Sequence, residues 1–130
     1  MDTNSQMPEL FQQKGDNFMS ACFEVHNTLG SGFLEEVYQE SLEMELTERG
    51  IPFVSKSRLQ LYYKDRLLKK YYEADLIVIG EILVELKAVK KLLPEHEAQL
   101  INYLKATRKH VGYLVNFCSF PRLEWKRLVH

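Results

Sequence analysis

The chain has 130 residues, of which 45% are hydrophobic and 27% charged, and its net charge is −1. This predicts one globular domain over residues 1–130, with a flexible tail at 1–7, and the near-neutral balance gives no compositional argument for nucleic-acid binding. No apolar run approaches a membrane span, no signal peptide is visible, and two distant cysteines exclude a disulfide framework, so we expect a cytoplasmic protein.

Two helices are predicted in the first part of the chain. Over residues 8–28 apolar side chains recur at helical spacing, and the LGSG segment that follows suits a helix end and a tight turn. A second helix is predicted over residues 33–50, with Gly50 at its end. If Gly32 caps this helix, Glu35 lies in its first turn, where the helix dipole favours a carboxylate.

After residue 50 the sequence becomes rich in β-branched and aromatic residues, which is typical of strands. A further helix begins near Pro94, a residue that suits a first helical turn. The uncharged run at 111–117 indicates a buried strand, and 124–129 a final edge strand. The order α-α-β-β-β-α-β predicts an α/β fold, a mixed sheet flanked by helices. The three antiparallel strands are expected over 53–63, 67–79 and 81–89.

Charged residues inside this apolar region raise the question of a site. Strand alternation places Glu85 and Lys87 on one face. Asp75 shares that face only if the hairpin near Gly80 has a three-residue loop or a bulge, because a two-residue turn sends Asp75 to the other face. We predict the shared face.

Two converging carboxylates repel each other unless a proton or a metal lies between them. Oxygen ligands without Cys partners suit Mg²⁺ or Mn²⁺, and a neighbouring lysine can orient a water molecule or stabilise charge on a phosphate. Asp75, Glu85 and Lys87 therefore suggest metal-assisted phosphodiester hydrolysis. The alternative is that Glu85 and Lys87 form an exposed ion pair on a half-solvated sheet.

The third predicted helix adds a polar stripe, because His96, Gln99 and Tyr103 recur at helical spacing after the Glu85 strand. Such side chains suit contacts with phosphates or with a metal-bound water. For His96 a surface role is the alternative, and for Tyr103 it is packing in the core.

Together these motifs resemble a known family. The segment GFLEEVY, with Gly32, Glu35 and Tyr38, is similar to the signature of the GxxExxY proteins, and the segments ADLIV, VELKAV, HEAQLINYLKAT and VGYLVNF resemble the rest of that family. The resemblance implies a compact member of the PD-(D/E)XK nuclease superfamily, with the restriction-endonuclease-like α-β-β-β-α-β core. Ala74 stands where the superfamily name has proline.

The resemblance also implies roles for particular residues. The acidic pair is Asp75 and Glu85, the lysine is Lys87, and the helix glutamate is Glu35. The Gln99 and Tyr103 pair fits the Q-x-x-x-Y element of the RecB-like branch. Mg²⁺ (or Mn²⁺) is then expected on Asp75, Glu85, the Leu86 carbonyl and Glu35, with Lys87 positioning the water and Gln99 and Tyr103 steadying the scissile strand.

Charge is unevenly divided along the chain, which bears on partners. Residues 1–50 carry 2 Lys/Arg against 10 Asp/Glu, and residues 51–130 carry 15 against 8. The basic side favours nucleic acid, DNA ahead of RNA, although two merely solvated faces are the alternative. An interaction module that binds nucleic acid or protein without catalysis, and a homodimer joined through 111–117 and 124–129, remain open. The basic residues expected to follow the phosphate backbone are Lys56, Arg58, Lys64, Arg66, Lys69, Lys70, Lys90 and Lys91.

Overall fold

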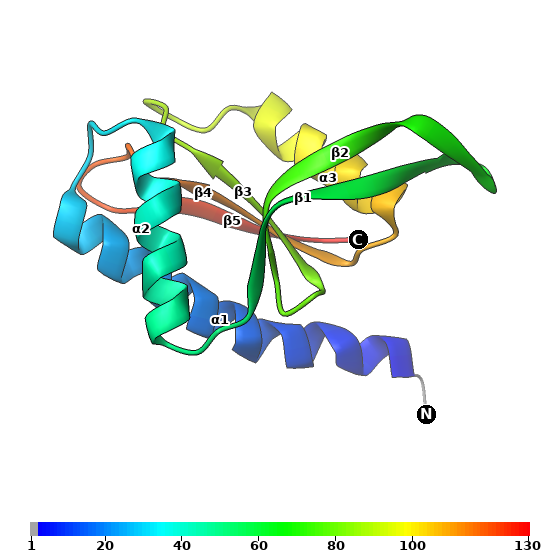
Figure 1. Cartoon of the computed structure of the whole chain (residues 1–130), viewed down its shortest axis with the longest axis horizontal. Coiled ribbons are helices and arrows are strands. Elements are labelled where there is room, and N and C mark those ends of the chain that lie inside the picture. Colours follow the sequence, from blue (N-terminus) through cyan, green and yellow to red (C-terminus); the bar gives the residue numbers. More distant parts are fainter. Residues whose placement is uncertain (1–2) are drawn as a thin grey trace.

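The computed structural model describes residues 3–130, with side chains described from residue 11 onward, and it forms a five-stranded sheet with three helices (Figure 1). The predicted α/β class is confirmed. The elements are α1 (Thr3–Leu29), α2 (Glu35–Glu48), β1 (Phe53–Tyr63), β2 (Arg66–Val78), β3 (Ile82–Lys87), α3 (Pro94–Thr107), β4 (Val111–Asn116) and β5 (Glu124–Val129).

The sheet has the order β1-β2-β3-β4-β5, in which only β3 and β4 are parallel. A parallel pair needs a crossover, and α3 supplies it. Two apolar clusters fill the two faces of the sheet. One packs side chains of α1 and α2 onto β3 and β4, and the other packs α3 onto the opposite face. The β1–β2 hairpin is longer than the other strands and extends beyond the sheet beside α3 (Figure 1).

Most predicted boundaries hold to within two residues, with corrections at two helix starts. Helix α1 begins at Thr3, before the predicted start at residue 8, because residues 3–7 carry no apolar periodicity that could indicate it. Of the predicted flexible tail, residues 1–2 lie outside the described part, and 3–7 are helical. Helix α2 has Leu34, not Gly32, at its N-cap, which makes Glu35 its first residue.

A dimer joined through 111–117 and 124–129 stays a prediction, and the sheet bears on one way to form it. Strand β4 pairs with β3 on one side and β5 on the other, so neither of its edges is open to a second chain. Among residues 3–130, no helix combines the length and apolarity needed to cross a membrane.

A buried asparagine fixes the loop that leads from β3 to α3. Asn116 Oδ1 accepts hydrogen bonds from the amides of Val89 (3.0 Å) and Cys118 (3.3 Å), and its Nδ2 donates to Glu124 Oε1 (3.1 Å). The same Glu124 oxygen accepts from the Leu92 amide at 2.9 Å. The end of β3 is therefore held to β4 and β5 by side chains as well as by the ladder.

Replacing Asn116 with alanine is expected to lower the free energy of unfolding by about 3 kcal/mol, because the substitution leaves partnerless amides where the side chain was buried. Urea denaturation followed by circular dichroism measures the change. Asn102→Ala, on the exposed side of α3, is the matched control and should change stability by less than about 0.5 kcal/mol. Equal effects of the two substitutions would contradict this account of the loop.

Candidate active site

The β2–β3 register brings the predicted acidic pair together. Leu76 pairs with Val84 and Val78 with Ile82, so the connection has three residues, 79–81. This is the loop length that the prediction required, and continuing the same register places Asp75 opposite Glu85. Gly80 and Ile79 both have positive φ (75° and 49°), which allows the chain to reverse in so short a loop.

The regular alternation of faces along β2 stops at Asp75. Tyr72 and Ala74 pack in the α3 cluster, whereas Leu76 and Val78 pack in the cluster under α1 and α2. In β1, the residue between the partners of Ala74 and Leu76 is Lys56, which has a positive φ of 52°. A non-glycine residue in this conformation is strained by about 1 kcal/mol, and such strain concentrates at functional sites. The hairpin therefore bends away from the sheet at the acidic pair.

Asp75 is buried and uses both of its carboxylate oxygens. Its Oδ2 accepts a hydrogen bond from the backbone amide of Leu86 at 2.7 Å, and Lys56 Nζ lies 3.2 Å from its Oδ1. Burial lowers the pKa of Lys56, but the hydrogen bond to Asp75 and the nearby carboxylates outweigh it and raise that pKa. Lys56 thus stays charged beside Asp75. Among the described lysines, it is the one that forms an ion pair with a predicted site residue.

Glu85 sits on the α3 side of β3, where the Tyr72 hydroxyl donates to its Oε1. Burial is the largest cause of a rise in the pKa of Glu85 to about 7. The half-buried Lys87 opposes this rise, and the Glu35 carboxylate adds to it. Glu85 is consequently poised between its neutral and charged forms near neutral pH.

Helix α2 supplies two residues, at its first and second turns. Burial raises the pKa of Glu35, and the Asp75 carboxylate raises it further, while Lys87 and Lys56 lower it. One turn later, Gln39 Nε2 donates to the backbone carbonyl of Asp75 at 2.8 Å. Its other polar atom, Oε1, is buried and has no hydrogen-bond partner within the described residues. Helix α2 is thereby fixed to the strand that carries Asp75.

The polar stripe on α3 reaches the site only indirectly. Tyr103 stacks on Tyr72 with ring centroids 3.7 Å apart, and Tyr72 contacts Glu85. Gln99 is exposed one turn before Tyr103, and no hydrogen bond joins it to the carboxylates in the described part of the chain. His96 accepts a hydrogen bond from the Leu93 amide at 3.0 Å and so caps α3, which is the surface role weighed for it.

The chemistry of this donor set fits a hard divalent cation. The groups are oxygen donors from Asp75, Glu85 and Glu35, and the unpartnered Gln39 Oε1 adds an acceptor that suits a metal-bound water. Within the described residues, however, no three His, Cys, Asp or Glu side chains form a metal-holding group. Lys56 and Tyr72 instead engage the acidic pair.

Three contributors were not predicted. Lys56 was assigned only to a basic face, Tyr72 was not singled out, and Gln39 was overlooked. Only Gln39 had a usable signal in the sequence, because it lies four residues after Glu35 and so on the same helix face. Lys56 and Tyr72 are placed by the bend of the hairpin, which no local pattern indicates.

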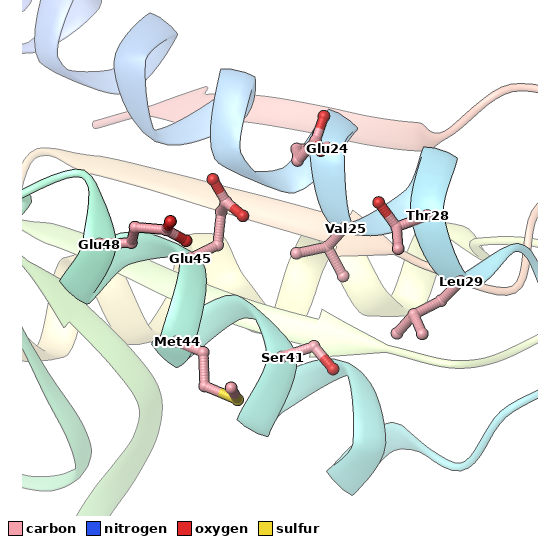
Figure 2. Close-up of a pocket in the computed structure, with 8 residues that line it drawn as sticks. All are labelled: Glu24, Val25, Thr28, Leu29, Ser41, Met44, Glu45 and Glu48. Carbon is pink, nitrogen blue, oxygen red and sulfur yellow. The ribbon is translucent and has the colours of Figure 1, made fainter.

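A second concave region lies between α1 and α2, away from the carboxylates. Figure 2 shows the residues that line it, which include Val25 and Leu29 of α1, Met44 of α2 and three glutamates. Its volume is about 210 Å³. Neither a lysine nor a predicted site residue lines it, so it is a surface groove rather than part of the carboxylate site.

Comparison with known proteins identifies the family and supports the fold. The family described as the PD-(D/E)XK nuclease superfamily matches residues 12–128. No curated protein matches the chain. The solved structure described as "Crystal structure of SSO0001" is similar with a TM-score of 0.57 and 20% identity, over 73% of this chain and 50% of that chain. The present chain thus spans about half the length of that protein, and this likeness concerns the fold alone.

Proposed function

The chain belongs to the PD-(D/E)XK nuclease superfamily, and on that premise we propose that it hydrolyses phosphodiester bonds of nucleic acid with the help of Mg²⁺ or Mn²⁺. The proposal is supported by the β2–β3 register, whose continuation sets Asp75 opposite Glu85, and by the Lys87 and Glu35 charges that act on the pKa of Glu85. Within the superfamily, the GxxExxY signature and the Q-x-x-x-Y element support a place in the GxxExxY family and the RecB-like branch.

Different roles are proposed for the metal ligands and for Lys87. Asp75, Glu85, the Leu86 carbonyl and Glu35 would hold the cation, which when bound supplies Lewis acidity at the phosphate and a more acidic water. Lys87 orients the attacking water and stabilises charge on the phosphate.

Other residues hold this arrangement in place. Lys56 forms an ion pair with Asp75, and Tyr72 orients the Glu85 carboxyl. Gln99 and Tyr103 steady the scissile strand. Gln39 fixes α2, and with it Glu35, against β2.

The proposed substrate is DNA ahead of RNA, and the proposed location is the cytoplasm, which the two free cysteines support. A homodimer or a protein partner is also proposed, and it would contribute to the choice of target.

Cleavage of a panel of nucleic acids tests the proposal. Wild-type protein with Mg²⁺ or Mn²⁺ is expected to cleave at least one of single-stranded, duplex or branched DNA or RNA, and EDTA should abolish cleavage. Glu85→Ala is expected to lower the rate by at least about 100-fold, because it removes a proposed metal ligand. Exposed Glu95→Ala, on the first turn of α3, makes the same chemical change outside the site and serves as the control.

The groove between α1 and α2 favours a second candidate, a module that binds a partner protein. Its glutamates and its apolar side chains suit a basic, amphipathic peptide. A folded protein that cleaves nothing on the panel and does not bind Mn²⁺ through Glu85 would favour this candidate. Binding of Mn²⁺ through Glu85 without cleavage would instead indicate a missing substrate or partner of the nuclease.

A further inference from the structure

The β1–β2 hairpin concentrates charge and aromatic rings beyond the bend at the site. Residues 56–73, here called the hairpin arm, contain six Lys/Arg and two Asp/Glu, and four of the chain's seven tyrosines. One of the two acids, Asp65, lies 3.8 Å from the Arg108 guanidinium. The arm is therefore strongly basic, although the whole chain is nearly neutral.

The two faces of the hairpin arm differ in what covers them. Leu59, Leu61 and Tyr72 face α3 and pack in its apolar cluster. The ladder pairs Gln60 with Tyr71 and Arg58 with Glu73, and all four side chains are exposed. The face away from α3 thus has no covering element among the described residues, and Tyr71 is 49% exposed on it.

The exposed rings carry cations beside them. The Arg58 guanidinium lies 4.5 Å from the centroid of the Tyr71 ring, and Lys64 Nζ lies 5.5 Å from that of Tyr63. Near the tip, Tyr63 is 61% exposed. Rings and guanidinium planes stack with unpaired bases, while the cations neutralise phosphates. Glu73 is the one acidic side chain on this face.

At its base the uncovered face leads to the Asp75 end of the carboxylate site. Arg58 lies two positions after Lys56, whose ammonium group reaches Asp75. A strand lying along the arm would therefore arrive at Asp75, one of the residues proposed to hold the cation. The rings favour a single strand, because paired bases in a duplex keep their faces stacked on one another and leave none for Tyr71 or Tyr63.

We propose that the uncovered face of the hairpin arm binds single-stranded nucleic acid, through Arg58, Tyr71, Tyr63 and the neighbouring lysines, and leads it to the site at Asp75. Delivery of the strand to the site rests on the proposed nuclease function, whereas the binding of the strand does not. Stacking and phosphate contacts are common to DNA and RNA, so both are named as ligands.

Fluorescence anisotropy of short labelled oligonucleotides, in EDTA to prevent cleavage, tests the binding. Arg58→Ala/Tyr71→Ala is expected to raise the Kd for a single strand about tenfold, and to flatten the dependence of log K on log salt by about 0.7, the value of one lost phosphate contact. Arg58→Lys/Tyr71→Phe, which keeps charge and ring, should stay within about threefold of the wild type. Thermal melts establish that each variant folds.

The matched control is Lys14→Ala/Phe23→Ala, which removes an exposed cation and an exposed ring from α1, away from the hairpin arm (Figure 1). Equal losses in the two double-alanine variants would overturn the inference, and so would an equal loss for duplex and single strand. Comparing oligodeoxynucleotide with oligoribonucleotide identifies which strand the arm prefers.

The two proposals can fail separately. If binding depends on the arm but no substrate is cleaved, this inference stands and the proposed nuclease function is wrong. If the substitutions in the arm change neither binding nor cleavage, this inference is wrong and the nuclease proposal stands.

Discussion

Lys87→Met is expected to slow strand cleavage by about 100- to 1,000-fold, which is the usual loss when one group that stabilises developing charge is removed from an active site. Lys87 is half-buried, and its charge lowers the pKa of both Glu35 and Glu85, so it lies among the carboxylates. Its ammonium group forms no ion pair in the described part of the chain, whereas that of Lys56 is engaged by Asp75. Lys87 is therefore the lysine available to a water molecule or a phosphate.

Lys90→Met provides the matched comparison, because Lys90 is exposed three residues later and its loss changes the net charge equally. Single-turnover cleavage at saturating enzyme separates the chemical step from binding. We expect the Lys90 variant to cleave within about twofold of the wild-type rate, since exposed charges act mainly on association. Equal rates in the two variants would remove Lys87 from the proposed mechanism.

The fold was largely predictable because each element carries a local pattern. The uncharged run 111–117 indicated a strand buried on both faces, and β4 is a central strand whose residues are all buried. The register of the acidic pair was predicted as a choice between two loop lengths, and Gly80 favoured the one that occurs. Helix α1 was the exception, because the sequence of residues 3–7 has no apolar periodicity that could indicate a helix.

The candidate site was less predictable, because contacts such as Tyr72–Glu85 and Lys56–Asp75 come from tertiary structure. Strict alternation predicts one continuous inner face for the hairpin, but the strained Lys56 changes the face that β1 and β2 present. That change turns Tyr72 toward Glu85 and Lys56 toward Asp75. Neither contact follows from spacing along the chain. The roles of Gln99 and of the Leu86 carbonyl stay predictions.

Glu85 is expected to make the metal-free protein less stable as the pH rises from 4.5 to 7. The folded-state pKa is about 7 and the ordinary value is 4.5, so the folded protein holds this proton more tightly than the unfolded chain does. The resulting stabilisation is fully present below pH 4.5 and is lost as the pH rises through 7. A shift of this size corresponds to about 3 kcal/mol.

Urea denaturation of wild type and Glu85→Gln, in EDTA at pH 4.5 and pH 8, measures this difference. Glutamine keeps the shape but cannot ionise, so the variant should match the wild type at the lower pH and exceed its stability by about 3 kcal/mol at the higher. Adding Mg²⁺ at pH 8 should then stabilise the wild type more than the variant, because only an ionised Glu85 attracts the cation. A variant that is no more stable than the wild type at pH 8 would show that Glu85 ionises without penalty. The site would then lack the burial that sets this carboxyl apart from one on the surface.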